Sequence, residues 1–66
     1  MTASRRPSRA FLRSSLAAWR RRLRFRERRL AAARRSGKRR RIEHWQRLVD
    51  KARYWRDRRA SQLKRA

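Results

Sequence analysis

The apolar residues in the first half of the chain fall on one stripe of a helix. From Arg9 to Arg35 they recur at alternating intervals of four and three residues, the repeat of one helix face. The stripe consists of Leu12, Leu16, Trp19, Leu23, Arg26, Leu30 and Ala33. Arg26 is its only charged member, and we expect Phe25 beside it to fill the gap. The pattern predicts an amphipathic helix over residues 9–35.

Local signals mark both ends of this helix. We expect Ser8 to be its N-cap, with Pro7 just outside, because a serine hydroxyl accepts from the free N–H groups of a first turn. Gly37 is the only glycine and follows the last apolar position, where helices commonly end on a left-handed residue. The hydroxyl groups of Ser14 and Ser15 compete with the hydrogen bonds of the helix backbone, so we expect the first turns of this helix to fray or kink.

A second stripe follows the Ser36–Gly37 turn and predicts a helix over residues 39–64. Its members are Ile42, Trp45, Val49, Ala52, Arg56, Arg59 and Leu63, with Leu48 and Trp55 beside them. A short connection favours antiparallel packing of consecutive helices. The sequence therefore predicts an all-α protein. One helical-hairpin unit spans residues 9–66, and a flexible basic arm, residues 1–8, precedes it.

Positive charge changes this picture more than any motif does. The 66 residues include 25 Lys and Arg against 4 Asp and Glu, a net charge of +21, and all but three of the basic residues are arginine. Such self-repulsion opposes compaction, and a chain this short has little core to offset it. It has no cysteine to form a disulfide. We expect marginal stability in dilute buffer and stabilisation by a bound anion or anionic membrane.

The arginine runs predict anion binding. Guanidinium groups bind phosphate oxygens in pairs and are weakly hydrated. Ordinary solvated helix faces alternate the sign of their charge, whereas these runs are purely positive. The predicted partners are an anionic membrane surface of lipopolysaccharide and acidic phospholipids, or nucleic acid. The predicted phosphate-binding residues are Arg20, Arg21, Arg22, Arg24, Arg26, Arg28, Arg29, Arg34, Arg35, Arg39, Arg40, Arg41, Arg56, Arg58 and Arg59.

The tryptophans allow three interpretations. Trp19 and Trp45 lie on the apolar stripes, which favours the hairpin core. Trp55 next to Tyr54 favours an anchor in a membrane headgroup region, because two adjacent aromatic residues of a helix cannot both face the core. Stacking on nucleobases would use the same rings. The candidates for membrane insertion or core packing are Leu12, Leu16, Trp19, Leu23, Trp45, Leu48 and Trp55.

Nothing in the chain predicts catalysis, a cofactor or a metal site. It has no cysteine nucleophile and no glycine-rich phosphate loop, and His44, expected at the surface, has no metal-ligating residue one helical turn away. The acids have arginines at helical spacing, which favours ion pairs. The expected pairs are Glu43 with Arg39 and Arg47, Asp50 with Arg47 and Arg53, and Asp57 with Arg53. We expect a protein that is not an enzyme.

Targeting signals are weak in this chain. No stretch approaches the roughly 20 apolar residues of a membrane-spanning helix, and no apolar signal-peptide core follows the N-terminal arginines. We therefore expect synthesis in the cytoplasm without a signal peptide. Residues 1–26 are rich in Arg and Ser and free of acid, as mitochondrial transit peptides are, but the same bias continues beyond them.

A short, cysteine-free, Arg- and Trp-rich chain with two amphipathic helices resembles the phage disruptins, cationic antibacterial proteins that disrupt the outer membrane of Gram-negative hosts during lysis. The likeness lies in length, charge density and the two-helix pattern of residues 9–64. It implies a protein that accumulates in the host cytoplasm and attacks the outer membrane once the inner membrane is permeabilised. Charge alone also fits a non-specific nucleic-acid-binding protein of a nucleoid, packaging machinery or ribosome. A weaker alternative is a virion structural peptide.

Overall fold

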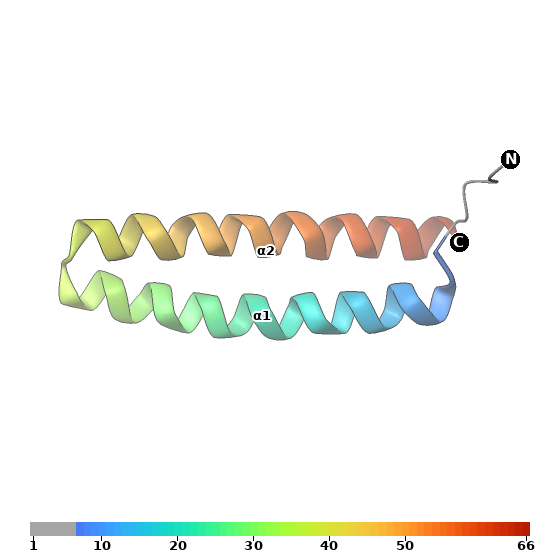
Figure 1. The fold of residues 1–66 in the computed structure, drawn as a ribbon, viewed down its shortest axis with the longest axis horizontal. Coiled ribbons are helices and arrows are strands. Elements are labelled where there is room, and N and C mark those ends of the chain that lie inside the picture. The colour runs from blue at the N-terminus through green and yellow to red at the C-terminus, as the bar shows by residue number, and fades with distance from the viewer. Residues whose placement is uncertain (1–6) are drawn as a thin grey trace, which may run out of the picture.

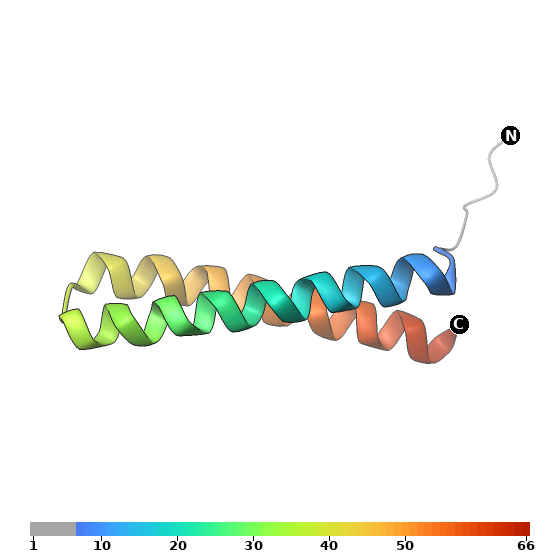
Figure 2. The same cartoon turned by 90° about the horizontal axis from the view of Figure 1, so that it is seen from below.

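Two long helices make up nearly all of the described chain. The computed structural model describes residues 7–66, so most of the predicted arm over residues 1–8 lies outside the described residues. Helix α1 spans Arg9–Ser36 and helix α2 spans Arg39–Arg65. They lie side by side and antiparallel (Figure 1), and the rotated view shows them crossing at a shallow angle (Figure 2). The predicted all-α hairpin is confirmed, with each helix one residue longer than expected.

Hydrogen bonds at the helix ends explain the bounds of α1. The Ser8 hydroxyl oxygen accepts from the Phe11 N–H at 3.1 Å, which confirms Ser8 as the N-cap. At the other end Gly37 adopts a left-handed φ of 70°, and its N–H donates to the Ala33 carbonyl at 3.1 Å. Only Gly37 and Lys38 separate the helices, so the chain reverses direction at once.

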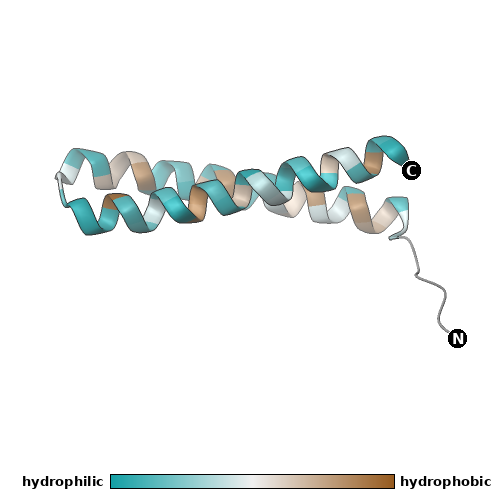
Figure 3. Ribbon diagram, turned by 90° about the horizontal axis from the view of Figure 1, so that it is seen from above, coloured by the Kyte–Doolittle hydropathy of each residue, from teal (hydrophilic) through white to brown (hydrophobic). Residues whose placement is uncertain are grey.

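One narrow apolar seam joins the helices. Its buried residues are all members of the predicted stripes: Leu12, Leu16, Leu23, Leu30, Ala33, Val49 and Ala52. Trp19, Ile42 and Trp45 pack partly buried against this core. Figure 3 shows hydrophobic residues as separate patches on otherwise hydrophilic helices. Because each helix buries only one side, the core is a line along the molecule and most of the surface is polar.

The serine pair near the start of α1 does not break the helix. The expected fray or kink is wrong, because α1 continues without interruption through Ser14 and Ser15. The Ser15 hydroxyl oxygen accepts from the Arg59 Nε of α2 at 3.0 Å. The hydroxyl that could have competed with the helix backbone is thus engaged by the partner helix instead.

Arg26 itself occupies the gap in the α1 stripe. The expectation that Phe25 fills this gap is wrong, since the Phe25 side chain is 47% exposed. Arg26 is half-buried and reaches across the seam, where its Nη1 donates to the Leu48 carbonyl of α2 at 2.9 Å. A cation therefore forms part of the helix–helix contact.

Replacing Gly37 with alanine is expected to lower the free energy of unfolding by about 1 kcal/mol, because an L-residue is strained in the left-handed region. No atom lies within 4 Å of the added Cβ, so no steric clash adds to the backbone strain. Thermal unfolding followed by far-UV circular dichroism measures the loss. Gly37→Asn should lose clearly less, and equal losses for the two variants would show that the positive φ is not the cause.

Candidate phosphate-binding surface

The predicted phosphate-binding arginines are distributed along both helices. Arg26, Arg56 and Arg59 are half-buried at the seam, and all the others are exposed. The exposed set comprises Arg20, Arg21, Arg22, Arg24, Arg28, Arg29, Arg34, Arg35, Arg39, Arg40, Arg41 and Arg58. Most of the guanidinium charge is therefore accessible to an anion, and the remainder lies where the helices meet.

The tryptophans lie at the helix–helix contact. Trp19 of α1 and Trp55 of α2 stack, with ring centroids 6.0 Å apart and an interplanar angle of 17°. Trp45 meets Phe25 edge-on, with centroids 6.1 Å apart. The predicted packing of Trp19 and Trp45 on the core is confirmed. Trp55, for which the sequence favours a headgroup anchor, is half-buried against Trp19 in the hairpin, and Tyr54, at 57% exposure, is the aromatic residue that turns away from the seam.

Guanidinium groups cover the stacked tryptophan pair. The Arg22 Cζ lies 4.6 Å from the Trp19 ring centroid, and the Arg59 Cζ lies 5.2 Å from that of Trp55. Arg59 is also 5.5 Å from the ring centroid of Phe11. Within about 6 Å a guanidinium is attracted to the electron-rich face of an aromatic ring. The rings thus hold cations in place without neutralising them.

The same arrangement continues along the contact towards the turn. The Arg29 Cζ lies 5.5 Å from the Phe25 centroid and 5.7 Å from the Trp45 centroid. Arg26 lies 5.8 Å from the Trp19 centroid while it donates to the Leu48 carbonyl. Within residues 7–66, no hydrogen bond or ion pair joins Arg22, Arg26, Arg29 or Arg59 to a carboxylate. The charge of these four guanidinium groups is therefore not balanced by a carboxylate of the described residues.

The carboxylates of the hairpin contact residues other than Arg22, Arg26, Arg29 and Arg59. Arg53 was expected to pair with Asp50 and Asp57 of its own helix, but its Nη2 lies 3.4 Å from Glu27 Oε2 of α1. Asp50 accepts instead from Gln46 Nε2 at 3.0 Å. The two intrahelical pairs expected of Arg53 are therefore wrong, because the facing helix brings a third carboxylate within its reach.

Two further ion pairs lie within α2. Arg39 Nε is 3.7 Å from Glu43 Oε2, as the spacing of four residues predicts. Asp57 pairs with its neighbour Arg56, whose Nη2 is 2.9 Å from Asp57 Oδ1. These pairs are largely exposed, so each contributes little to stability. Their main effect is to reduce repulsion along a helix rich in arginine.

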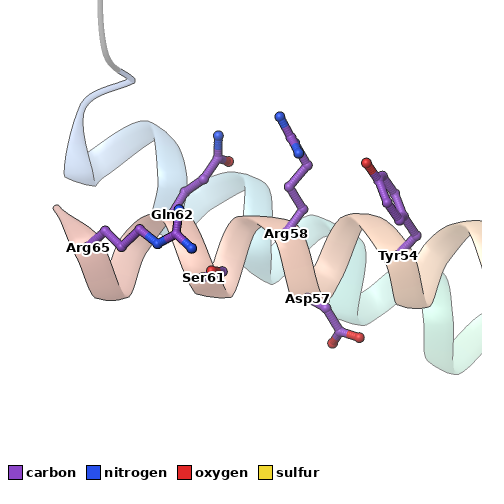
Figure 4. Close-up of a pocket in the computed structure, with 6 residues that line it drawn as sticks. All are labelled: Tyr54, Asp57, Arg58, Ser61, Gln62 and Arg65. Carbon is purple, nitrogen blue, oxygen red and sulfur yellow. The ribbon is translucent and has the colours of Figure 1, made fainter.

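A shallow hollow of about 370 Å³ runs along the outer side of α2. Its lining residues recur at successive helical turns and are Tyr54, Asp57, Arg58, Ser61, Gln62 and Arg65. Figure 4 shows Tyr54, Arg58 and Gln62 pointing to one side of the helix and Asp57 pointing to the other. Because all of these residues belong to one helix, the hollow is a surface furrow between side chains rather than a cleft between elements.

The lone histidine does not belong to a metal-ligand cluster of the described residues. His44 is exposed, as expected, with its ring edge-on to Trp45. Across residues 7–66 no three His, Asp or Glu side chains gather as metal ligands. In the same range neither helix combines the length and the apolar character needed to cross a bilayer.

No protein-family model, curated protein or solved structure matches this chain. Fold and surface together define an arginine-covered antiparallel helical hairpin.

Three residues of this surface were not singled out from the sequence as site residues: Phe11, Ser15 and Phe25. A spacing of seven residues provides a signal for all three. Ser15, Arg22 and Arg29 are spaced by seven residues, which places them on one line beside the apolar stripe of α1. Phe11 and Phe25 are 14 residues apart, two repeats of seven, so they also share one line along α1. Which arginines they contact is decided only by the packing of the two helices.

Sulfate is expected to raise the melting temperature more than chloride does at equal, low ionic strength. Both anions screen the repulsion between arginines, but only sulfate offers the several oxygens that guanidinium binds in pairs. A ligand that binds the folded state stabilises it. Thermal unfolding in matched series of the two salts measures the difference, and coincident melting temperatures would mean that screening alone acts.

Arg26→Leu is expected to raise the free energy of unfolding by about 1 kcal/mol. Leucine completes the stripe and removes one charge from a chain of net charge +21, and the lost hydrogen bond to Leu48 offsets only part of this gain. Thermal or urea unfolding measures the change. Arg28→Leu is the matched control, because it removes the same charge from an exposed position. An Arg26→Leu variant less stable than wild type would contradict the prediction.

Proposed function

We propose that this protein is a cationic antibacterial protein that binds the anionic phosphates of the bacterial outer membrane and disrupts that membrane, during phage-induced host lysis. The observation that carries the proposal is the row of guanidinium groups held over aromatic rings, with no carboxylate among their partners. Phe11 and Phe25 are 51% and 47% exposed in the same row. Cations next to half-exposed rings suit the headgroup region, which is partly wet and partly apolar.

Charge supplies the affinity for such a membrane. Each basic residue near an anionic surface contributes about 1 kcal/mol, and this diminishes with salt. The chain carries 25 basic residues, so contact by a fraction of them is enough for firm adhesion. Arginines that bind the phosphates of lipopolysaccharide also compete with the divalent cations that bridge those phosphates. Adhesion therefore weakens the outer leaflet even before any residue inserts.

Disruption also needs apolar surface beneath the headgroups. The leucines of α1 face α2 in the closed hairpin and are buried. Two polar contacts across the seam, from Arg26 to the Leu48 carbonyl and from Arg59 to the Ser15 hydroxyl, use neutral acceptors. Phosphate is a stronger acceptor for guanidinium than either. Phosphate binding then draws these arginines away from the seam, and the helices splay and expose their leucines to the membrane.

The proposed route follows the resemblance to phage disruptins. The protein is made in the host cytoplasm without a signal peptide, is released when the inner membrane is permeabilised, and acts on the outer membrane from the periplasmic side. No residue is catalytic in this proposal, and neither a cofactor nor a metal takes part.

Nucleic-acid binding is the competing function, and the same charge favours it. Trp19 and Trp55 bear on the choice. Each ring is half-buried and already contacts the other ring and a guanidinium group, Arg22 or Arg59. These contacts leave less ring surface for a stacked base, which is the main sequence-tolerant contact to single strands. The arrangement therefore favours phosphates at a lipid surface.

Purified protein added to Gram-negative cells in low salt is expected to cause dye uptake and loss of viability, and millimolar magnesium should suppress both. Magnesium competes with arginine for the same phosphates, so suppression identifies the target. Cells that stay intact at micromolar protein, while duplex DNA is bound at physiological salt, would favour the nucleic-acid alternative. Binding to DNA alone does not decide the matter, because a chain this basic binds DNA whatever its task.

A further inference from the structure

The contacts between α1 and α2 form two sets, one on each side of the buried seam. The first set joins Trp19 to Trp55, Phe25 to Trp45, Arg26 to Leu48 and Ser15 to Arg59. The second set joins Glu27 to Arg53 and Arg34 to Gln46. With about 100° of rotation per residue, Arg26 and Glu27 lie on opposite sides of the line through the buried Leu23 and Leu30.

These two sides differ in chemistry. We call the side with the first set of contacts the aromatic face. It contains Phe11, Ser15, Arg22, Phe25, Arg26 and Arg29 of α1 with Trp45, Leu48, Trp55 and Arg59 of α2. We call the side with the second set of contacts the carboxylate face. It contains Glu27 and Arg34 of α1 with Gln46, Asp50, Arg53 and Asp57 of α2. Within residues 7–66, no contact of the aromatic face involves a carboxylate.

The acids of α2 all follow one line on the carboxylate face. Glu43, Asp50 and Asp57 are spaced by seven residues, so they lie above one another along the helix. Gln46 links Asp50 to Arg34 of the facing helix, with distances of 3.0 Å to each. The few negative charges of the chain are therefore collected on one side, where they meet arginines, and the other side keeps its positive charge uncompensated.

We infer that the hairpin lies flat on an anionic lipid surface, with the aromatic face towards the headgroup phosphates and the carboxylate face towards water. This inference rests on the proposed function. Carboxylates within a Debye length of about 8–10 Å from lipid phosphates are repelled by them, so the carboxylate face is disfavoured as the contact. The aromatic face instead offers uncompensated guanidinium groups together with the half-exposed Phe11 and Phe25.

The partner inferred for the aromatic face is lipid, because this face combines two properties. Its guanidinium groups match phosphate, which lipid headgroups and nucleic acids share. Its half-exposed phenylalanines gain from a layer that excludes part of the water, and a bilayer surface provides that layer just beneath the phosphates. The phosphate backbone of a duplex presents charge without such a layer. Lipid is therefore the inferred partner, and duplex DNA is the alternative that the experiments below compare with it.

Adjacent alanines of α1 provide matched positions for the test. Ala31 and Ala32 are both exposed. Ala32 borders the same small hollow as Arg29 and Trp45, so it lies towards the aromatic face. Ala31 lies one helical turn from Glu27 and from Arg34, hence towards the carboxylate face. The chain has no cysteine, so Ala31→Cys or Ala32→Cys each creates one labelling position.

Each single-cysteine protein is labelled with an environment-sensitive fluorophore and mixed with vesicles of phosphatidylglycerol and phosphatidylethanolamine. The label at Ala32→Cys is expected to shift its emission to the blue, and the label at Ala31→Cys to shift little. Equal shifts, or a larger shift at Ala31→Cys, overturn the inferred orientation. Co-sedimentation with the vesicles measures binding separately. Bound protein with the wrong shifts refutes the orientation alone, whereas absence of binding to vesicles refutes the proposed function as well.

A second comparison needs no label. Phe11→Ser combined with Phe25→Ser is expected to raise the protein concentration needed for half-maximal vesicle leakage by about tenfold, because apolar contact area is lost. Tyr54→Ser is the control, since Tyr54 is 57% exposed one turn from Asp50 and Asp57. It should change that concentration by about twofold or less. Circular dichroism verifies that both variants keep their helices. Equal effects, or the same ranking in binding to duplex DNA, overturn the lipid orientation.

Discussion

Repulsion among guanidinium groups constrains everything else in this molecule. A chain of 66 residues with a net charge of +21 cannot gather its arginines around a compact centre. Two antiparallel helices joined along one seam are a fold that buries apolar side chains while leaving nearly every guanidinium at the surface. The helices also spread the charge along their length. The narrow core and the extended shape are thus two consequences of the same electrostatic cost.

Where charge comes closest to the seam, the protein uses two different means to tolerate it. On the carboxylate face, Glu27 lies within 3.4 Å of Arg53 and partly cancels its charge. On the aromatic face, rings and neutral acceptors contact Arg26 and Arg59 and leave their charge intact. The first means serves the stability of the hairpin. The second leaves the guanidinium charge available to an external anion, as the proposed membrane contact requires.

The sequence predicts the fold well because its signals are local. The spacing of the apolar stripes, the serine at position 8 and the glycine at position 37 each act within a few residues, and all three appear in the structure as expected. The errors concern partners that only the register between helices decides. Whether Trp55 stacks on Trp19, and whether Arg53 pairs with Asp50 or Glu27, depends on which turns of α1 and α2 lie opposite each other. Periodicity within one helix does not contain that information.

The turn of Gly37 and Lys38 has a consequence for the helices once they separate. A connection of two residues keeps α1 and α2 tethered, so they never diffuse apart. The effective concentration of one helix near the other stays in the millimolar range typical of short links, or above it. Reassociation is then a unimolecular event that outpaces encounters between separate molecules. A splayed hairpin that leaves a surface can close again on itself before its apolar stripes meet those of a neighbour.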